Sequence, residues 1–402
     1  MWITVNLGGL CDVITKGTTP TSVGYKFQDS GINFVKVESI GVNGTFIPAK
    51  FAKIGDDCHF ALKRSQLKEG DILFSIAGAL GRTAIVTEEV LPANTNQALA
   101  ILRLKPGIEV NKKFLLYVLN SDSVKKQSDT NKGGVAQQNL SLSQLKNYEI
   151  ALPPLTEQQR IVAKLDAAFA GIDRAIQITR SSEAAANNIF TKELSNIFKT
   201  QSNTWIKATI EEVCDIRSGG TISKKLEKQT GDIPYLKVAD MNLAENSQEV
   251  VTSSCFVMRG EVSSKAIIKN GSVIFPKRGG AIATNKKRIT ATDIYADLNI
   301  MSVHPKAGLS PKLLYFYFLN VDMAKLGSGS SIPQINNYDI QPLEISFPSS
   351  DAEQELVVAK IDSLKNEVDK LSKTYADKQH ELEWLKSAIL AQELQPTECE
   401  AA

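Results

Sequence analysis

The sequence is duplicated, and this repeat limits the folds open to the chain more than any other feature. Residues 2–18 (WITVNLGGLCDVITKGT) align with residues 205–221 (WIKATIEEVCDIRSGGT) at an offset of 203. Four matches follow in the same order: INFVKV with IPYLKV, KEGDILF with KNGSVIF, FLLYVLN with LYFYFLN, and EQQRIVAKLD with EQELVVAKID. Chance similarity between short apolar segments is a poor explanation for matches that keep their order at nearly constant offset. The repeat therefore predicts one folding unit used twice.

Each half divides into a globular part and a helical part. Residues 1–150 and 201–350 carry short runs rich in β-branched and aromatic residues, broken by Gly, Asn, Asp and Pro, which predict strands joined by turns. One short amphipathic helix is predicted in each, at VNKKFLLYVLNSD and SPKLLYFYFLNVD. We expect two mixed α/β domains with these boundaries.

Residues 151–200 and 351–402 are predicted to be long helices, the second followed by a C-terminal tail. Capping-box spacing places Thr156 with Gln159 and Ser350 with Glu353 at their starts. Apolar residues then recur about every 3.5 positions, the spacing of a coiled-coil seam. The predicted seam residues are Leu165, Ile172, Ile176, Ile361, Leu364, Val368, Leu371, Tyr375, Leu382 and Leu385. The alternative is two amphipathic helices, each buried in its own domain.

The resulting fold class is α+β. Two mixed α/β domains are separated by two long antiparallel coiled-coil helices, with a pseudo-two-fold internal repeat. Because the chain order is domain, helix, domain, helix, antiparallel pairing predicts domains at opposite ends of the helices.

The net charge of +2 conceals an uneven distribution. Residues 1–150 have 17 Lys and Arg against 13 Asp and Glu, residues 201–350 have 17 against 14, and residues 351–402 have 6 against 12. Both predicted domains are mildly basic, and the distal helix is acidic.

Basic and amide side chains gather in glycine-containing loops, which suit contacts to DNA phosphates and base edges. In each half, one such loop follows the strand DILF or SVIF. A second lies at residues 128–141 in the first half and at residues 326–336 in the second. The candidate DNA-binding residues are Lys36, Arg82, Lys132, Gln137, Lys237, Lys277, Arg278, Asn285, Lys286, Lys287, Arg288 and Ser330. Ordinary solvated turns have a similar composition and remain the alternative.

Several function classes lack their sequence signals. The five cysteines and three histidines have no zinc-site or disulfide pattern, and the adjacent Cys58 and His59 are expected on opposite faces of a strand. Neither a phosphate loop nor a dinucleotide-binding glycine motif occurs. We predict no catalytic residues, no metal and no cofactor on this chain. No apolar run is long enough for a membrane helix and no secretion signal is present, so a cytoplasmic location is expected.

The whole pattern resembles the specificity subunit of type I restriction-modification enzymes. LPPLTEQQRIVAKLD (152–166) is close to that family's signature at the start of its helices, whereas FPSSDAEQELVVAKID (347–362) lacks the proline pair and has one extra residue. LKSAILAQELQP also looks like the family's distal helix.

The resemblance implies that each domain recognises one half of an interrupted, asymmetric site in double-stranded DNA, while the helices set the gap. It further implies two methyltransferase subunits that bind S-adenosylmethionine, and restriction (motor-nuclease) subunits that cut DNA. Two other classes stay open: a duplicated protein-interaction scaffold with a coiled-coil spacer, and a self-contained enzyme.

Overall fold

The structure is a computed structural model that describes residues 1–41, 43–130, 139–199, 203–327 and 333–395. The chain forms two compact units. Unit 1 comprises Met1–Thr179 and Asp377–Ala402, and unit 2 comprises Arg180–Ala376. Each unit thus combines a globular part with segments of both long helices.

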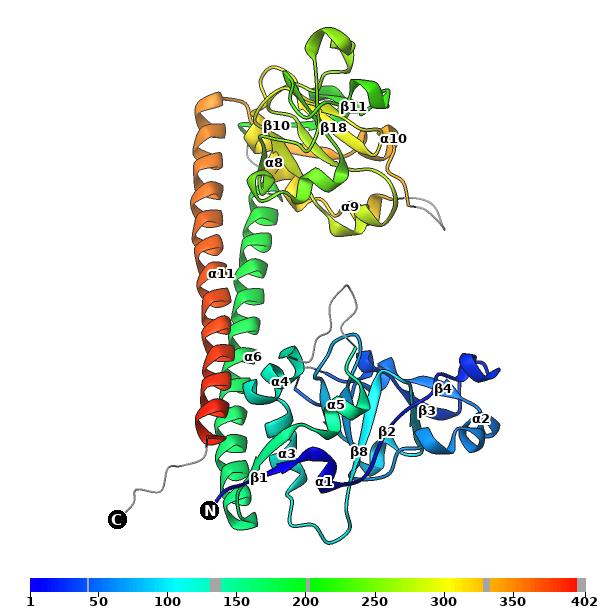
Figure 1. Ribbon diagram of the computed structural model, residues 1–402. Helices are drawn as coiled ribbons and strands as arrows, with labels where there is room; N and C mark the ends of the chain where they lie inside the picture. Colours follow the sequence, from blue (N-terminus) through cyan, green and yellow to red (C-terminus); the bar gives the residue numbers. More distant parts are fainter. Residues whose placement is uncertain (42, 131–138, 200–202, 328–332, 396–402) are drawn as a thin grey trace. The chain divides into compact units, whose positions relative to one another are not determined.

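The elements of the globular part of unit 1 precede the first long helix (Figure 1). They are β1 (Ile3–Asn6), α1 (Leu7–Leu10), β2 (Cys11–Lys16), β3 (Ile32–Val35), β4 (Ala52–Ile54), α2 (Asp56–Ala61), β5 (Ile72–Ser75), β6 (Thr83–Ile85), β7 (Ala93–Thr95), β8 (Leu99–Leu104), α3 (Lys112–Leu119), α4 (Asp122–Thr130), α5 (Leu142–Lys146) and β9 (Glu149–Leu152). The main sheet has the order β2-β8-β5-β6, and smaller sheets are β4-β3-β7 and β1-β9.

Unit 2 repeats this order. Its elements are β10 (Trp205–Thr209), α7 (Ile210–Val213), β11 (Cys214–Ser218), β12 (Ile233–Leu236), β13 (Glu249–Val250), β14 (Phe256–Val257), β15 (Val273–Pro276), β16 (Arg288–Thr290), β17 (Tyr295–Ala296), β18 (Ile300–Pro305), α8 (Pro311–Asn320), α9 (Met323–Leu326), α10 (Asn337–Ile340) and β19 (Glu344–Pro348). The sheets are β11-β18-β15-β16-β13, β14-β12-β17 and β10-β19. The matching strand orders confirm the predicted repeat, to which unit 2 adds β13.

The two long helices are α6 (Leu155–Lys199) and α11 (Asp351–Glu393). In unit 1 the ammonium of Lys164 lies 2.6 Å from Glu393, and that of Lys386 lies 2.8 Å from Asp173. One helix therefore rises in residue number where the other falls, which confirms antiparallel pairing in this unit. In unit 2, Lys365 of α11 lies over the Phe190 ring of α6.

The same glutamine contact joins globule and long helix in both units. Gln158 of α6 accepts a hydrogen bond from Asn111 N–H (2.8 Å) and donates to the carbonyls of Glu109 and Pro153. Gln354 of α11 accepts from Ser310 N–H (2.7 Å) and donates to the carbonyls of Gly308 and Pro348. Asn111 and Ser310 are the N-caps of α3 and α8. Both glutamines are fully buried, so each one fixes a short helix to a long one.

The sequence predicted the cap of the second long helix correctly but not that of the first. The Ser350 hydroxyl accepts from the Glu353 N–H at 3.3 Å, as expected of a cap. Thr156, however, lies inside α6, which begins at Leu155 directly after the proline pair. The prolines set this start, because proline suits the beginning of a helix better than its interior.

Only part of the predicted seam is buried. Leu165, Ile172, Ile176, Ile361 and Val368 are buried, and Leu364, Tyr375 and Leu382 are partly buried. Leu371 and Leu385 are wrong, since they are 44% and 41% exposed. A straight helix drifts by about 20° per heptad from a strict 3.5-residue repeat, so a stripe read over several heptads includes residues that leave the contact face.

Candidate nucleic-acid interface

In each half the fold places one predicted DNA-contacting loop beside the described end of the other. In unit 1, Ile76 follows β5; its N–H donates to the Ala98 carbonyl (2.8 Å) and its carbonyl accepts from Leu140 N–H (2.9 Å). In unit 2, Lys277 follows β15 and makes the same two backbone bonds with Asn299 and Ile335, also at 2.8 and 2.9 Å. The loop after β5 or β15 therefore lies beside the segment that leads to α5 or α10.

The loops differ in length and content. Between Ser75 and Arg82 unit 1 has a short apolar connection, IAGALG. Comparing the pairing of β15 with β16 to that of β5 with β6 aligns Lys286 with Arg82 and Lys287 with Thr83. The loop of unit 2 is therefore longer, and it contains the 3-10 helix η11 (Gly279–Thr284).

Arg82 and Lys286 each donate to the segment after β3 or β12, but to different groups. The Arg82 guanidinium donates to the Ile40 carbonyl at 2.8 Å, beside the 3-10 helix η2 (Val37–Ser39). The Lys286 ammonium donates to the Asn242 side chain, at the end of the corresponding helix η7 (Val238–Asn242). In each unit this cation holds the loop to the segment after β3 or β12.

Lys287 is only 2% exposed, contrary to its predicted place on an exposed basic cluster. Its ammonium donates to the Asn285 side chain (2.7 Å) and the Val321 carbonyl (2.6 Å). Burial lowers its pKa to about 8, against a smaller opposing effect of Asp322. A buried ammonium with two internal acceptors holds the loop in place and does not reach a phosphate.

Arg288 also turns inward, and Asn285 is exposed but makes hydrogen bonds within unit 2. The Arg288 guanidinium donates to the carbonyls of Asn246, Lys287 and Met241, and burial lowers its pKa. Asn285 adopts a left-handed backbone conformation (φ +53°), and its side-chain oxygen also accepts from Met323 N–H (2.9 Å). The sequence predicted a cationic surface here because these residues are neighbours in the chain. It does not reveal that some of their side chains donate to internal carbonyls instead.

Lys277 and Arg278 point in opposite directions, as adjacent residues of extended chain do. Lys277 is buried, its ammonium donates to the Ser218 hydroxyl (2.7 Å), and burial lowers its pKa. Arg278 is exposed, and its guanidinium has no ion pair within the described residues. Arg278 is therefore the loop cation best placed to contact a ligand.

Lys36 and Lys237 occupy equivalent positions directly after β3 and β12. The Lys36 ammonium lies 4.6 Å from the centre of the Phe27 ring, and that of Lys237 lies 2.6 Å from Glu227. The Glu227 hydrogen bond raises the Lys237 pKa. Both side chains are partly exposed. Lys132, Gln137 and Ser330 lie outside the described residues.

The Cys58 and His59 pair lies in helix α2 and not on the expected strand. Burial raises the pKa of the Cys58 thiol, and His59 is hydrogen-bonded to Asn94. The two residues form no dyad.

Sequence reasoning missed the role of Gln158 and Gln354. The signal was present, since both follow Glu157 or Glu353 in the repeated EQ of EQQRIVAKLD and EQELVVAKID.

Large apolar side chains remain exposed along the long helices. Leu356 is 72% exposed and Trp384 is 68% exposed, and Ile178, Ile189, Leu371 and Leu385 are also exposed. Exposed apolar side chains of this size are typical of protein-binding surfaces.

The sequence matches the Type I restriction modification DNA specificity domain over residues 1–181 and 202–378. The chain belongs to this family. The two matched regions agree with the internal repeat. Membership of a DNA specificity family also agrees with the prediction that this chain is not itself an enzyme.

Two curated relatives of this specificity domain protein are specificity subunits. The Type I restriction enzyme EcoBI specificity subunit of Escherichia coli is 30% identical over 170 residues, covering 42% of this chain and 35% of the relative. The Type I restriction enzyme MjaIX specificity subunit of Methanocaldococcus jannaschii is 24% identical over 164 residues, covering 38% and 36%. The matches span about a third of either relative.

Solved structures show the same fold. One, which concerns complex assembly and conformational transition of the type I R-M system, has a TM-score of 0.77 at 20% identity and covers 98% of this chain and 97% of its own. The HsdS subunit from Thermoanaerobacter tengcongensis has a TM-score of 0.51 at 19% identity, with coverage of 98% and 96%. These similarities confirm two repeated α/β domains with long helices.

Searches of the described residues found no helix that is both long and apolar enough to cross a membrane. Within the same residues, no group of three or more His, Cys, Asp or Glu side chains is placed to hold a metal ion.

Proposed function

We propose that this chain is the DNA-recognition subunit of a type I restriction-modification complex. Each globular domain, at residues 1–150 and 201–350, recognises one half of an interrupted target in double-stranded DNA. The long helices, at residues 151–200 and 351–402, set the gap. The protein acts in the cytoplasm, where its DNA target lies.

The paired loops carry this proposal. Both units place the loop after β5 or β15 beside the segment before α5 or α10 through equivalent backbone bonds at Ile76 and Lys277. A duplicated framework that presents two different loops suits the recognition of two different half-sites, so the target is asymmetric. Arg278, Lys36 and Lys237 are the described candidates for DNA contact. Six further residues position the loops: Arg82, Lys277, Asn285, Lys286, Lys287 and Arg288.

The exposed apolar residues of the long helices support recruitment of partner subunits. Trp384 and Leu356 are large and mostly solvent-exposed, and burial of such side chains supplies much of the free energy of protein association. We propose two methyltransferase subunits as the partners, each binding S-adenosylmethionine, with restriction subunits joining the complex. This chain holds no cofactor in that scheme.

Methylome sequencing of a host that carries this gene and its partner genes tests the proposal. The expected result is methylation at an interrupted sequence whose two halves differ. A palindromic methylated sequence would contradict the assignment of different half-sites to the two domains.

Electrophoretic mobility shifts with the same duplex at several salt concentrations separate this function from a protein scaffold. A DNA-binding protein that contacts phosphates loses affinity steeply as salt rises, because bound counterions are released on association. Absence of salt-dependent binding to a duplex containing the mapped target would favour the scaffold.

A further inference from the structure

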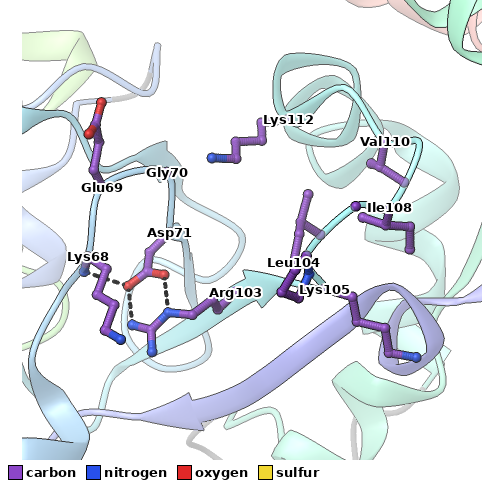
Figure 2. A pocket seen from close by; sticks show the side chains of 12 residues that line it. Lys68, Glu69, Gly70, Asp71, Arg103, Leu104, Lys105, Ile108, Val110 and Lys112 are labelled. Atoms are coloured by element: carbon purple, nitrogen blue, oxygen red, sulfur yellow. Dashed lines mark hydrogen bonds and ion pairs between the residues drawn. The ribbon is translucent and has the colours of Figure 1, made fainter.

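Unit 1 contains a cavity of about 350 Å³ that lies apart from the candidate DNA-contacting loops. It is formed by the turn before β5 and the loop that joins β8 to α3, and Figure 2 shows the side chains around it. Basic side chains predominate in its lining, with Lys68, Arg103, Lys105 and Lys112 against Glu69 and Asp71.

Arg103 is held rigidly at one side of the cavity. Its Nε and Nη2 atoms donate to the two carboxylate oxygens of Asp71 at 2.8 and 2.7 Å. Asp71 is buried and also accepts from the Lys68 N–H at 2.8 Å. The Nη1 atom of Arg103 has no hydrogen bond among the described residues, so two N–H donors remain for a ligand.

Lys112, the first residue of α3, extends across the cavity towards Gly70 (Figure 2). Gly70 has φ +79°, and a Cβ atom there would lie 1.8 Å from the Lys112 ammonium nitrogen. The glycine therefore leaves the space that this ammonium occupies. Within the described part of the chain, the ammonium groups of Lys68, Lys105 and Lys112 have no hydrogen bond or ion pair.

Unit 2 keeps two of these cations, because Lys269 and Lys306 correspond to Lys68 and Lys105, but it lacks the other two. In unit 2 the same turn has Gly271, also at φ +79°, but Pro311 takes the place of Lys112. Ser272 and His304 replace Asp71 and Arg103, with Oγ and Nδ1 3.1 Å apart, and the cavity that they line is about 10 Å³. Lys112 and Arg103 therefore have no lysine or arginine at the equivalent positions of unit 2.

We propose that this cavity binds a small phosphate-bearing molecule of the nucleoside phosphate class. The ammonium of Lys112 and the free edge of Arg103 supply charge-assisted donors for phosphate oxygens, and Lys68 and Lys105 add positive charge. Leu104, Ile108 and Val110 form an apolar wall for the rest of the ligand. A volume of this size lies within the range of small-molecule sites.

The cavity is also connected to the long helix. Its loop wall contains Glu109 and leads to Asn111, both of which bond to Gln158 of α6. A bound phosphate would order this wall, so the ligand should raise the thermal unfolding temperature of the full-length chain.

Isothermal titration calorimetry of the full-length chain with pyrophosphate and with ATP, at constant ionic strength set by chloride, tests the proposal. We expect saturable binding and a weakening of about tenfold in Lys112→Met, which removes one charged donor and keeps the aliphatic stem. Lys105→Met should weaken binding less. Lys269→Met is the matched control, because Lys269 precedes the equivalent turn of unit 2, and it should bind as the wild type does.

Arg103 is left unchanged in this test, since its removal would strand the buried Asp71 carboxylate. Lack of saturable binding of either probe at several millimolar, or equal binding by wild type and Lys112→Met, would overturn the proposal. Weaker duplex DNA binding by Lys112→Met without binding of either probe would also overturn it and assign the lysine to DNA. The proposal is independent of the DNA-recognition function, which the methylation pattern tests separately.

Discussion

The two units attach their globules to the long helices in the same way, but they build their loops differently. Gln158 and Gln354 make matching sets of three hydrogen bonds. By contrast, the loop after β5 is short and apolar, and the loop after β15 is longer and contains five cationic residues with its flanks. The repeat therefore keeps these glutamine joints between globule and long helix and varies its loops, which suits the proposed recognition of two different half-sites.

The largest effect on stability should come from the joints made by Gln158 and Gln354. Gln158→Leu and Gln354→Leu each leave buried backbone groups without partners, so we expect each to lower the free energy of unfolding of its unit by about 3 kcal/mol. Urea denaturation monitored by circular dichroism measures the loss. Gln159→Leu, on the exposed side of α6, is the control and should change little. If one of the two buried variants matched wild type, the joints would not be equivalent.

The next effect is a pH dependence of stability that comes from Lys287, whose counterpart in unit 1 is the uncharged Thr83. Burial lowers the pKa of Lys287 from 10.5 to about 8. Between these pH values the unfolded chain binds a proton that the folded chain lacks. The stability of wild type relative to Lys287→Met should therefore rise from pH 8 to 10.5 by up to about 3 kcal/mol, and this gain is absent below pH 8.

Urea midpoints of wild type and Lys287→Met, measured side by side at several pH values, give this difference. The paired measurement removes the contributions of cysteines and tyrosines that titrate in both proteins. Parallel stability curves would show that Lys287 titrates normally and is not buried.

A smaller effect concerns the exposed loop cation of unit 2. Arg278→Ala should weaken DNA binding by about tenfold at low salt and reduce the slope of log affinity against log salt by about one. Lys370→Ala, an exposed charge on α11, is the control with the same charge change. The backbone bonds align Ala77 of unit 1 with Arg278, so Ala77→Arg should strengthen DNA binding. Identical salt slopes for Arg278→Ala and wild type would remove Arg278 from the interface.

The smallest effect tests a pair of matching ion pairs. Lys113 lies 2.6 Å from Asp166, and Lys312 lies 2.8 Å from Asp362. Asp166 also accepts from the Tyr117 hydroxyl, whereas the residue of α8 at the same distance from the helix N-cap is Phe316. Asp166→Asn should cost about 1 kcal/mol of unfolding free energy and Asp362→Asn about 0.3 kcal/mol. Equal urea midpoints for the two variants would mean that the tyrosine contributes nothing.

The sequence predicted the fold well because its evidence is periodic and repeated. Strands at DILF, ALAILRL and SVIF and the helices α3, α8, α6 and α11 lie where apolar spacing indicated. The seam was less accurate at Leu371 and Leu385, since spacing alone does not measure the rotation of a helix against its partner.

The candidate interface was harder to predict. DNA contact by the predicted loops stays a prediction, and the structure places the loop after β5 or β15 beside the described end of the second loop through Ile76 and Lys277. The sequence did not distinguish Lys287 and Arg288, which donate to internal carbonyls, from Arg278, which is exposed. That distinction depends on tertiary acceptors such as the Val321 and Met241 carbonyls, which no local pattern reveals.

The joints also bear on how such a protein can change over generations. Most partners of Gln158 and Gln354 are main-chain groups, contributed by Glu109, Asn111 and Pro153 in one unit and by Gly308, Ser310 and Pro348 in the other. Every residue type supplies a carbonyl, and all but proline supply an N–H. Side chains around the joint can therefore change without loosening it. Under the proposed function, one domain could then acquire a new half-site while its neighbour keeps the old one.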